Sequence, residues 1–367
     1  MSHCIKITLV AGAAIAMAVS LPAVPAQASN GLHPAAGAVY VLSNQVAGNS
    51  VITYTRASDG RLRPASTYPT GGTGTGAGLG SQNAVVVDDA GRHVYAVNAG
   101  SDSITSFQVT GSGLRRTSTV WSGGDAPVSI SVRGNLAYVL NTGSAGSISA
   151  FRVHDGRLTH LAGSTRTLSS SAAGAAEVAI SPDRRDVVVT EKATSLIDIY
   201  PLDPHGYATS RHSVLSVEAT PFGFSFTSSG KLAVSEAGPS AVSTYAITDD
   251  GLRTLSGSVG NTEAAACWVV VTDDGRFVYT GNGGGSQSVS GYHLDRHGAL
   301  GLFSDGGKTA SAPAGVSDIA LSADNRFLYA RLGDGTVGAF AVGRTGTLSA
   351  LPITPGLPAG AAGIAAR

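Results

Sequence analysis

Four acidic residues lie where repeated apolar runs begin or end, and their chemistry could support catalysis or binding. Glu191 and Glu236 end the runs VVVTE and LAVSE, whereas Glu177 and Asp318 lie near the start of two other runs. Carboxylates that lie close together shift one another's pKa, which suits a general base or a cation site. The sequence therefore predicts Glu191 and Glu236 as catalytic candidates that end equivalent strands and face each other at the channel mouth, with the pKa of one of them raised. Glu177 and Asp318 are predicted as ligand-binding candidates.

Asparagines and one tryptophan occupy corresponding places in other copies of the pattern. Asn98, Asn141 and Asn282 end apolar runs, and Trp268 lies near the start of another. One interpretation is a polar funnel in which these side chains bind a ligand together with the acids. The other is that they satisfy backbone groups of the loops between repeats. Both interpretations stay open at this point.

Other motifs favour structural roles. The glycine-rich run Gly71–Gly80 precedes a predicted strand rather than a helix, so it lacks the context of a phosphate-binding loop and predicts a flexible loop at the rim. Cys267 is predicted as a small core residue. His293 and His297 lie in a strand and its turn, with no helix to bring them together as metal ligands. We predict no cofactor, although a divalent cation could be held by the acidic residues at the channel mouth.

Seven copies of one hairpin must position these side chains. Each copy has a β-branched residue, two variable residues, an aromatic residue and then a turn glycine five or six positions later, and the fourth copy aligns less cleanly. Successive aromatic residues are 44 to 53 positions apart, which is near the length of a four-stranded propeller blade. The aromatic residues are Tyr54, Phe107, Phe151, Tyr200, Tyr245, Tyr292 and Phe340, and the glycines are Gly60, Gly113, Gly156, Gly206, Gly251, Gly298 and Gly346.

This repeat predicts an all-β fold, a seven-bladed β-propeller with four antiparallel strands in each blade. The first copy begins at Ala38 with what would be the second strand of its blade. The segment Leu357–Arg367 follows a complete seventh copy and resembles the starts of innermost strands at Pro127 and Pro221. We therefore expect the C-terminal segment to supply the innermost strand of blade 1, which closes the ring and removes an open sheet edge.

The N-terminal residues indicate export. An apolar run, Ile7–Pro25, follows Lys6 and precedes small residues at the predicted cleavage position after Ala28. We expect a signal peptide over 1–28, a short linker over 29–36, a propeller over 37–367, and a secreted, extracellular protein. The alternative is an uncleaved membrane anchor, but the run is short and contains two prolines.

The charge balance and cysteine content narrow the choice of partners. The chain has 24 Lys and Arg and 24 Asp and Glu, which argues against nucleic acid or an anionic membrane as a partner. After cleavage Cys267 is the single cysteine, so an intrachain disulfide is not available. We expect a monomer, without a membrane span, whose partner is a small polar ligand or an extracellular or wall-associated molecule.

A seven-fold repeat with a V-Y-x-x-N strand resembles the lactonase-type seven-bladed β-propellers and their YVTN-repeat relatives. That group includes 6-phosphogluconolactonases and carboxymuconate-lactonising enzymes, and the resemblance covers residues 37–367. It implies a propeller fold, and it places Glu236 and Glu191 on two acidic positions of the family.

The same resemblance exposes departures from the family pattern. Pro221-Phe222-Gly223 stands where the family usually has Pro-Arg-His, and Gly174 and Ala176 replace two histidines. Arginine and histidine at these places would position an anionic substrate and polarise its carbonyl group. We therefore expect a ligand-binding or protein-interaction propeller that uses its polar channel mouth. The alternative is a lactone hydrolase that uses the same mouth.

Overall fold

The computed structural model describes residues 35–367. The predicted signal peptide over 1–28 and most of the predicted linker lie outside the described residues. The first strand begins at Ala35, two residues before the predicted start of the propeller. In the described part of the chain, no helix is long and apolar enough to cross a membrane.

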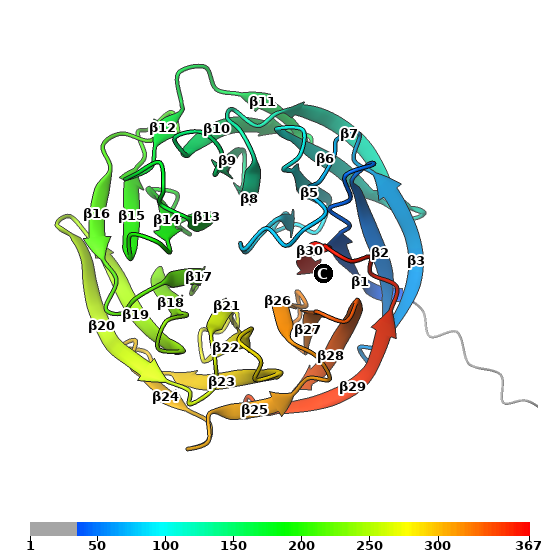
Figure 1. Ribbon diagram of the computed structural model, residues 1–367, viewed down its shortest axis with the longest axis vertical. Helices are drawn as coiled ribbons and strands as arrows, with labels where there is room; N and C mark the ends of the chain where they lie inside the picture. The colour runs from blue at the N-terminus through cyan, green and yellow to red at the C-terminus, as the bar shows by residue number, and fades with distance from the viewer. Residues whose placement is uncertain (1–34) are drawn as a thin grey trace, which may run out of the picture. The chain divides into compact units, whose positions relative to one another are not determined.

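Seven antiparallel sheets are arranged around a common axis, so the predicted seven-bladed propeller is confirmed (Figure 1). We call the strands of a blade A to D from the axis outward. Blade 1 contains β30 (Ala362–Ala366), β1 (Ala35–Leu42), β2 (Ser50–Ala57) and β3 (Leu62–Pro69). Blade 2 contains β4 (Val85–Val87), β5 (His93–Asn98), β6 (Ser103–Thr110) and β7 (Gly113–Trp121). Blade 3 contains β8 (Pro127–Arg133), β9 (Leu136–Asn141), β10 (Ser147–His154), β11 (Arg157–His160) and β12 (Arg166–Thr167).

Blades 4 to 7 follow the same order, and a divided strand D occurs in blade 6, as it does in blade 3. These blades contain β13 (Ala175–Ile180), β14 (Asp186–Glu191), β15 (Leu196–Pro201) and β16 (His212–Leu215); β17 (Pro221–Phe226), β18 (Lys231–Glu236), β19 (Ala241–Thr248) and β20 (Gly251–Gly260); β21 (Ala266–Val271), β22 (Phe277–Asn282), β23 (Ser288–Leu294), β24 (Leu300–Leu302) and β25 (Lys308–Ser311); and β26 (Val316–Leu321), β27 (Phe327–Leu332), β28 (Thr336–Val342) and β29 (Leu348–Pro355).

The C-terminal strand closes the ring as predicted. In Figure 1, β30 lies beside β1, and the two strands pair in antiparallel register with Val41 opposite Ile364. At the end of this ladder, the Arg367 N–H donates to the Ala38 carbonyl at 2.9 Å, and the Ala38 N–H donates to the Arg367 carbonyl at 3.3 Å. Blade 1 therefore combines the two ends of the described chain in one sheet.

A repeated contact joins neighbouring blades on the face that carries the A–B and C–D turns. A strand B tyrosine donates its hydroxyl to the carbonyl of the turn glycine in the next blade, and the strand B residue two positions earlier packs over the same glycine. At Gly60, whose φ is +85°, an added Cβ would lie 2.2 Å from the Phe327 ring, so a side chain would clash there. The hydroxyl contacts are Tyr138 to Gly206 at 2.9 Å, Tyr279 to Gly346 at 2.7 Å and Tyr329 to Gly60 at 2.8 Å.

Candidate functional site

The middle of the ring is crossed by the segment between β3 and β4, which enters it in Figure 1 as a light-blue chain. Its last residues, Ser81–Asn83, form a plug that bonds to several blades. The Gln82 side chain donates to the Val269 carbonyl at 2.8 Å and accepts from the Val269 N–H at 2.9 Å, as a strand would. The glycine-rich run Gly71–Gly80 thus leads into a plug with specific partners, which loop composition alone did not predict.

Glu177 and Trp268, both predicted as ligand-binding residues, meet at this plug. One Glu177 carboxylate oxygen accepts from the Asn83 side chain, and the other accepts from the Phe224 N–H, each at 2.6 Å. The Trp268 indole N–H donates to the Ser81 carbonyl at 3.0 Å. These two side chains therefore fix the position of the plug through hydrogen bonds to Asn83 and Ser81.

Lys192 holds the plug from the mouth side. Its ammonium group donates to the Gly80 carbonyl and lies 4.8 Å from the centre of the Phe222 ring. Burial lowers the pKa of Lys192 and raises the pKa of its neighbour Cys267 to about 11, so the neutral thiol is favoured. Cys267 is partly buried.

Asp318 lies on blade 7 and accepts a hydrogen bond from the N–H of Ile319 at 2.8 Å through Oδ1. Its second carboxylate oxygen, Oδ2, is buried and has no hydrogen-bond partner among the described residues. Burial raises the pKa of Asp318 to about 7, although the Arg331 guanidinium and the N–H groups of Ile319 and Ile364 act in the opposite direction. Arg331 donates to the Ser317 carbonyl at 2.8 Å, and its Nε is also buried without a partner in the described part of the chain.

Asp318 is close enough to Glu177 for its charge to affect the pKa of Glu177. Burial raises the pKa of Glu177 well above its usual range, the Phe224 N–H opposes this shift, and the charge of Asp318 adds to it. The acids that interact across the ring are therefore Glu177 and Asp318, which come from blades 4 and 7.

Glu236 is fully buried inside blade 5 rather than open to the channel mouth. Its carboxylate accepts from the Ser216 hydroxyl at 2.9 Å, the Glu218 N–H at 3.0 Å, the Ser243 hydroxyl at 2.8 Å and the Tyr245 hydroxyl at 3.2 Å. Ser243 and Tyr245 belong to strand C of the same blade, and Ser216 and Glu218 belong to the segment that connects blade 4 to strand A of blade 5. This carboxylate therefore connects strand C of its own blade with the segment that leads into that blade.

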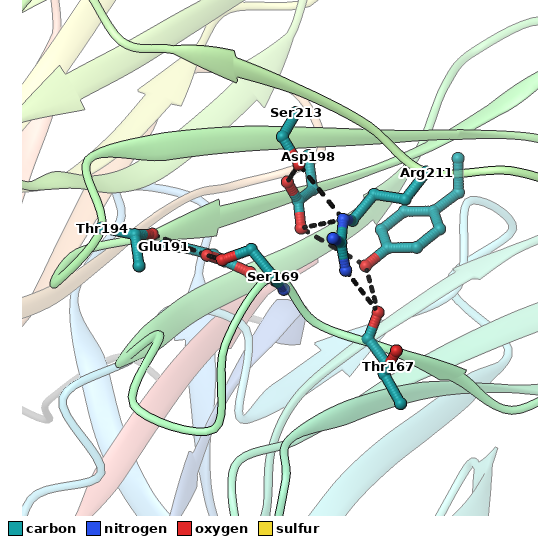
Figure 2. A network of polar contacts seen from close by, with 8 residues as sticks. Thr167, Ser169, Glu191, Thr194, Asp198, Arg211 and Ser213 are labelled. Carbon is teal, nitrogen blue, oxygen red and sulfur yellow. Dashed lines mark hydrogen bonds and ion pairs between the residues drawn. The ribbon is translucent and has the colours of Figure 1, made fainter.

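Glu191 has the same kind of environment in blade 4, as Figure 2 shows. Its carboxylate accepts from the Ser169 N–H at 2.9 Å, from the Ser169 hydroxyl, and from the Thr194 hydroxyl at 2.6 Å. The side chain is fully buried.

The expected facing pair of Glu191 and Glu236 is therefore a wrong prediction. The two carboxylates end equivalent strands, but each turns into its own blade, where hydroxyl and N–H donors satisfy it. Alternation along a strand fixes the face on which a side chain lies. It does not show whether strand C of the same blade supplies donors there. A catalytic role of either residue stays a prediction.

Two candidate residues were not predicted from the sequence, Arg331 beside Asp318 and the acidic residue Asp198. Asp198 lies in strand C of blade 4, fully buried, and accepts from the Ser213 hydroxyl at 2.6 Å, while the Arg211 guanidinium lies 3.7 Å away (Figure 2). Burial raises the pKa of Asp198 to about 7; Ser213 opposes this shift, and the neighbouring carboxylate of Glu191 adds to it. The signal for Asp198 was the poorly aligned fourth copy, in which an aspartate takes the place that serine or threonine has in several other copies.

The three asparagines predicted as ligand-binding residues are fully buried within and between blades. Asn98 donates to Ser103 and Thr105 at 3.1 and 3.0 Å, and Asn282 donates to two serines of its own blade at 2.9 Å each. Asn141 donates to the Ser122 carbonyl at 3.4 Å. The contacts of Asn98 and Asn282 favour the interpretation that these asparagines satisfy groups of the repeat, whereas Asn141 Oδ1 is buried and has no hydrogen-bond partner among the described residues. Over residues 35–367, no group of three or more His, Cys, Asp and Glu side chains is arranged to hold a metal ion.

Comparisons with known proteins agree with this architecture. Residues 32–167 match the family model described as "Lactonase, 7-bladed beta-propeller". No curated protein matches the chain.

Solved structures extend the likeness to most of the chain. A protein from Bacteroides uniformis described as a candidate 6-phosphogluconolactonase is 18% identical with a TM-score of 0.70, and the match covers 89% of this chain and 98% of that one. A protein from Lactobacillus plantarum is 16% identical with a TM-score of 0.72, with 90% and 99% covered. The periplasmic gluconolactonase of Pseudomonas aeruginosa is 17% identical with a TM-score of 0.67, with 88% and 97% covered.

At these identities the structural likeness concerns the fold. The family match and the ring of seven four-stranded blades point to the same architecture. The resemblance of this chain to the lactonase-type seven-bladed β-propellers is thereby confirmed.

Proposed function

We propose that this propeller binds a small polyhydroxylated ligand at its channel mouth, beside Asp318 and Arg331. The observation that supports this is a buried acceptor, Asp318 Oδ2, and a buried donor, Arg331 Nε, neither of which has a hydrogen-bond partner within residues 35–367. Buried polar groups normally have hydrogen-bond partners, and a hydroxyl group can both donate and accept. Arg331 is partly exposed as a residue whereas Asp318 is buried.

Lactone hydrolysis is the second candidate function. It is favoured by the similar structures described as gluconolactonases and by a carboxyl group with a pKa of about 7. Such a group can take a proton from an attacking water near neutral pH. In this hypothesis, the Arg331 guanidinium stabilises the oxyanion that forms at the lactone carbonyl.

One assay separates the two functions. The protein is tested with a panel of sugar lactones by acid release, and with the corresponding sugar acids and free sugars by calorimetry. Saturable binding without acid release supports the binding function, and acid release lost in Asp318→Asn supports hydrolysis. We expect Arg331→Gln to weaken binding at least tenfold, while the exposed Arg344→Gln serves as a matched control. If no ligand binds and no acid is released, or if Arg331→Gln matches its control, the proposal is wrong.

Secretion is part of the same proposal and rests on the residues of the N-terminal region alone. The apolar run and the small residues before the predicted cleavage position support export. Expression of the full chain should release a protein that begins at Ser29 into the medium, as N-terminal sequencing would show. A product that stays in the membrane with an intact N-terminus would support the anchor alternative instead.

A further inference from the structure

A groove of about 930 Å³ lies between blades 4 and 5, on the face that carries the A–B and C–D turns. One wall includes Asp186 and Ile199 of blade 4, and the other includes Ala246, Ile247 and Gly251 of blade 5. This volume lies within the range of small-molecule pockets. The groove is separate from the plug and from Asp318, which lie toward the other end of the strands.

The groove exists because blade 4 lacks the side chains that fill the corresponding place at other blade interfaces. Five blades have a tyrosine at the position of Val188, namely Tyr40, Tyr95, Tyr138, Tyr279 and Tyr329 in blades 1, 2, 3, 6 and 7. In blade 4, Asp186 takes the place two positions before Val188. At the interfaces that follow blades 2, 3, 6 and 7, an added Cβ on the next turn glycine would lie within 3.0 Å of the strand B side chain two positions before the tyrosine. The pairs are Gly156 with His93, Gly206 with Leu136, Gly346 with Phe277 and Gly60 with Phe327, and Phe303 also covers Gly346.

At the two remaining interfaces, strand D supplies the cover. Tyr68 lies over Gly113 between blades 1 and 2, and Leu255 lies over Gly298 between blades 5 and 6. Between blades 4 and 5, the atom nearest to an added Cβ on Gly251 belongs to the smaller Val214, at 3.2 Å. The described ring therefore has one interface without a large side chain from strand B or strand D over the turn glycine.

We propose that this groove binds a small phenolic ligand, whose ring occupies the space that a strand B tyrosine ring, such as that of Tyr138 between blades 3 and 4, fills at other interfaces. Ile199, Ala246 and Ile247 provide apolar contacts for the ring. The Asp186 carboxylate has no side-chain hydrogen bond within the described residues, and it provides an acceptor for the ligand hydroxyl. Amphipathic aromatic rings bury a large apolar area and usually find a hydrogen-bond partner for the hydroxyl.

The probe for this proposal is p-cresol, which is the tyrosine side chain without a backbone. We expect saturable shifts of the Ile199 and Ile247 methyl resonances in NMR titrations, while the methyl resonance of Ile130, in blade 3, stays unchanged. Val188→Tyr restores the side chain found in other blades, and it should weaken p-cresol binding at least tenfold. Val217→Tyr adds a tyrosine at an exposed site outside the groove and should leave binding unchanged.

A second variant keeps the proposal testable if Val188→Tyr does not fold. Asp186→Leu introduces the side chain that covers the turn glycine between blades 3 and 4, and it should also abolish the methyl shifts. The proposal is overturned if p-cresol causes no saturable shift at Ile199 and Ile247. It is also overturned if a folded groove variant binds p-cresol as tightly as the unchanged chain.

Discussion

At the scale of single residues, the buried acids Glu191 and Glu236 stabilise their own blades by accepting hydrogen bonds. Glu236 accepts four hydrogen bonds from hydroxyl and N–H groups, and Glu191 accepts from Ser169 and Thr194. A buried carboxylate with several donors stabilises the segments that supply those donors. Its removal leaves the donors without an acceptor and lowers the stability of the fold. The residues that looked most catalytic in the sequence are thus also the residues most tightly built into the structure.

Replacement of Glu236 by Gln should therefore reduce stability. The glutamine oxygen can take the place of Oε1, which accepts from Ser216, Glu218 and Tyr245, but the NH2 group cannot accept from the Ser243 hydroxyl as Oε2 does. The remaining bonds also lose their charged acceptor, so we expect the free energy of unfolding to fall by about 2 kcal/mol. Chemical denaturation measures this change. Glu218→Gln, at an exposed side chain, is the matched control and should have little effect. A variant of normal stability that loses ligand binding would instead restore Glu236 as a site residue.

At the scale of elements, the repeat predicted most of the architecture, whereas the plug was not predicted. Hairpin spacing recurs locally in the sequence, so the seven blades and the closing strand could be predicted. The contacts of Gln82 with Val269 join residues far apart in the chain, and nothing in the glycine-rich run indicates them. The partners of Glu191 and Glu236 were missed for a related reason, because they come from loops and strands that strand alternation does not specify.

The closing strand is the element on which the ring depends. Deletion of residues 357–367 removes β30 and leaves β1 with an unpaired edge. Asp318 also loses the Ile364 N–H that favours its charged form. We expect loss of cooperative thermal unfolding in calorimetry. A chain shortened by the same number of residues at its N-terminus, within the predicted signal peptide, serves as the control, and a deletion variant with unchanged unfolding would contradict the role of β30.

At the scale of the whole molecule, buried acids with raised pKa values make stability depend on pH. Asp198 and Asp318 each have a pKa of about 7 in the folded chain, against 3.8 for an ordinary aspartate, and that of Glu177 is raised in the same direction. Between about pH 4 and 7 the folded state retains protons that the unfolded state releases, so the free energy of unfolding falls as pH rises.

We therefore expect the protein to be more stable at pH 5 than at pH 8. The difference should be about 2–4 kcal/mol, the order that a three-unit pKa shift of one buried group allows. Denaturant unfolding across this range measures it. Asp318→Asn keeps an acceptor oxygen but cannot ionise, so it should flatten the curve and gain most stability above pH 7. A curve that rises from pH 5 to pH 8 would contradict this account.

The pairing of Ala38 with Arg367 has a consequence for the way the chain can be rearranged. In blade 1, β30 and β1 are joined by hydrogen bonds at the place where other blades have a covalent A–B turn. The backbone of the described ring is therefore continuous except at this one position. A short turn such as Asp273–Arg276 of blade 6 would bridge this break between Arg367 and Gly37. The other six A–B turns are then equivalent places for new termini, and a circular permutant opened at any of them keeps every strand pair of the ring.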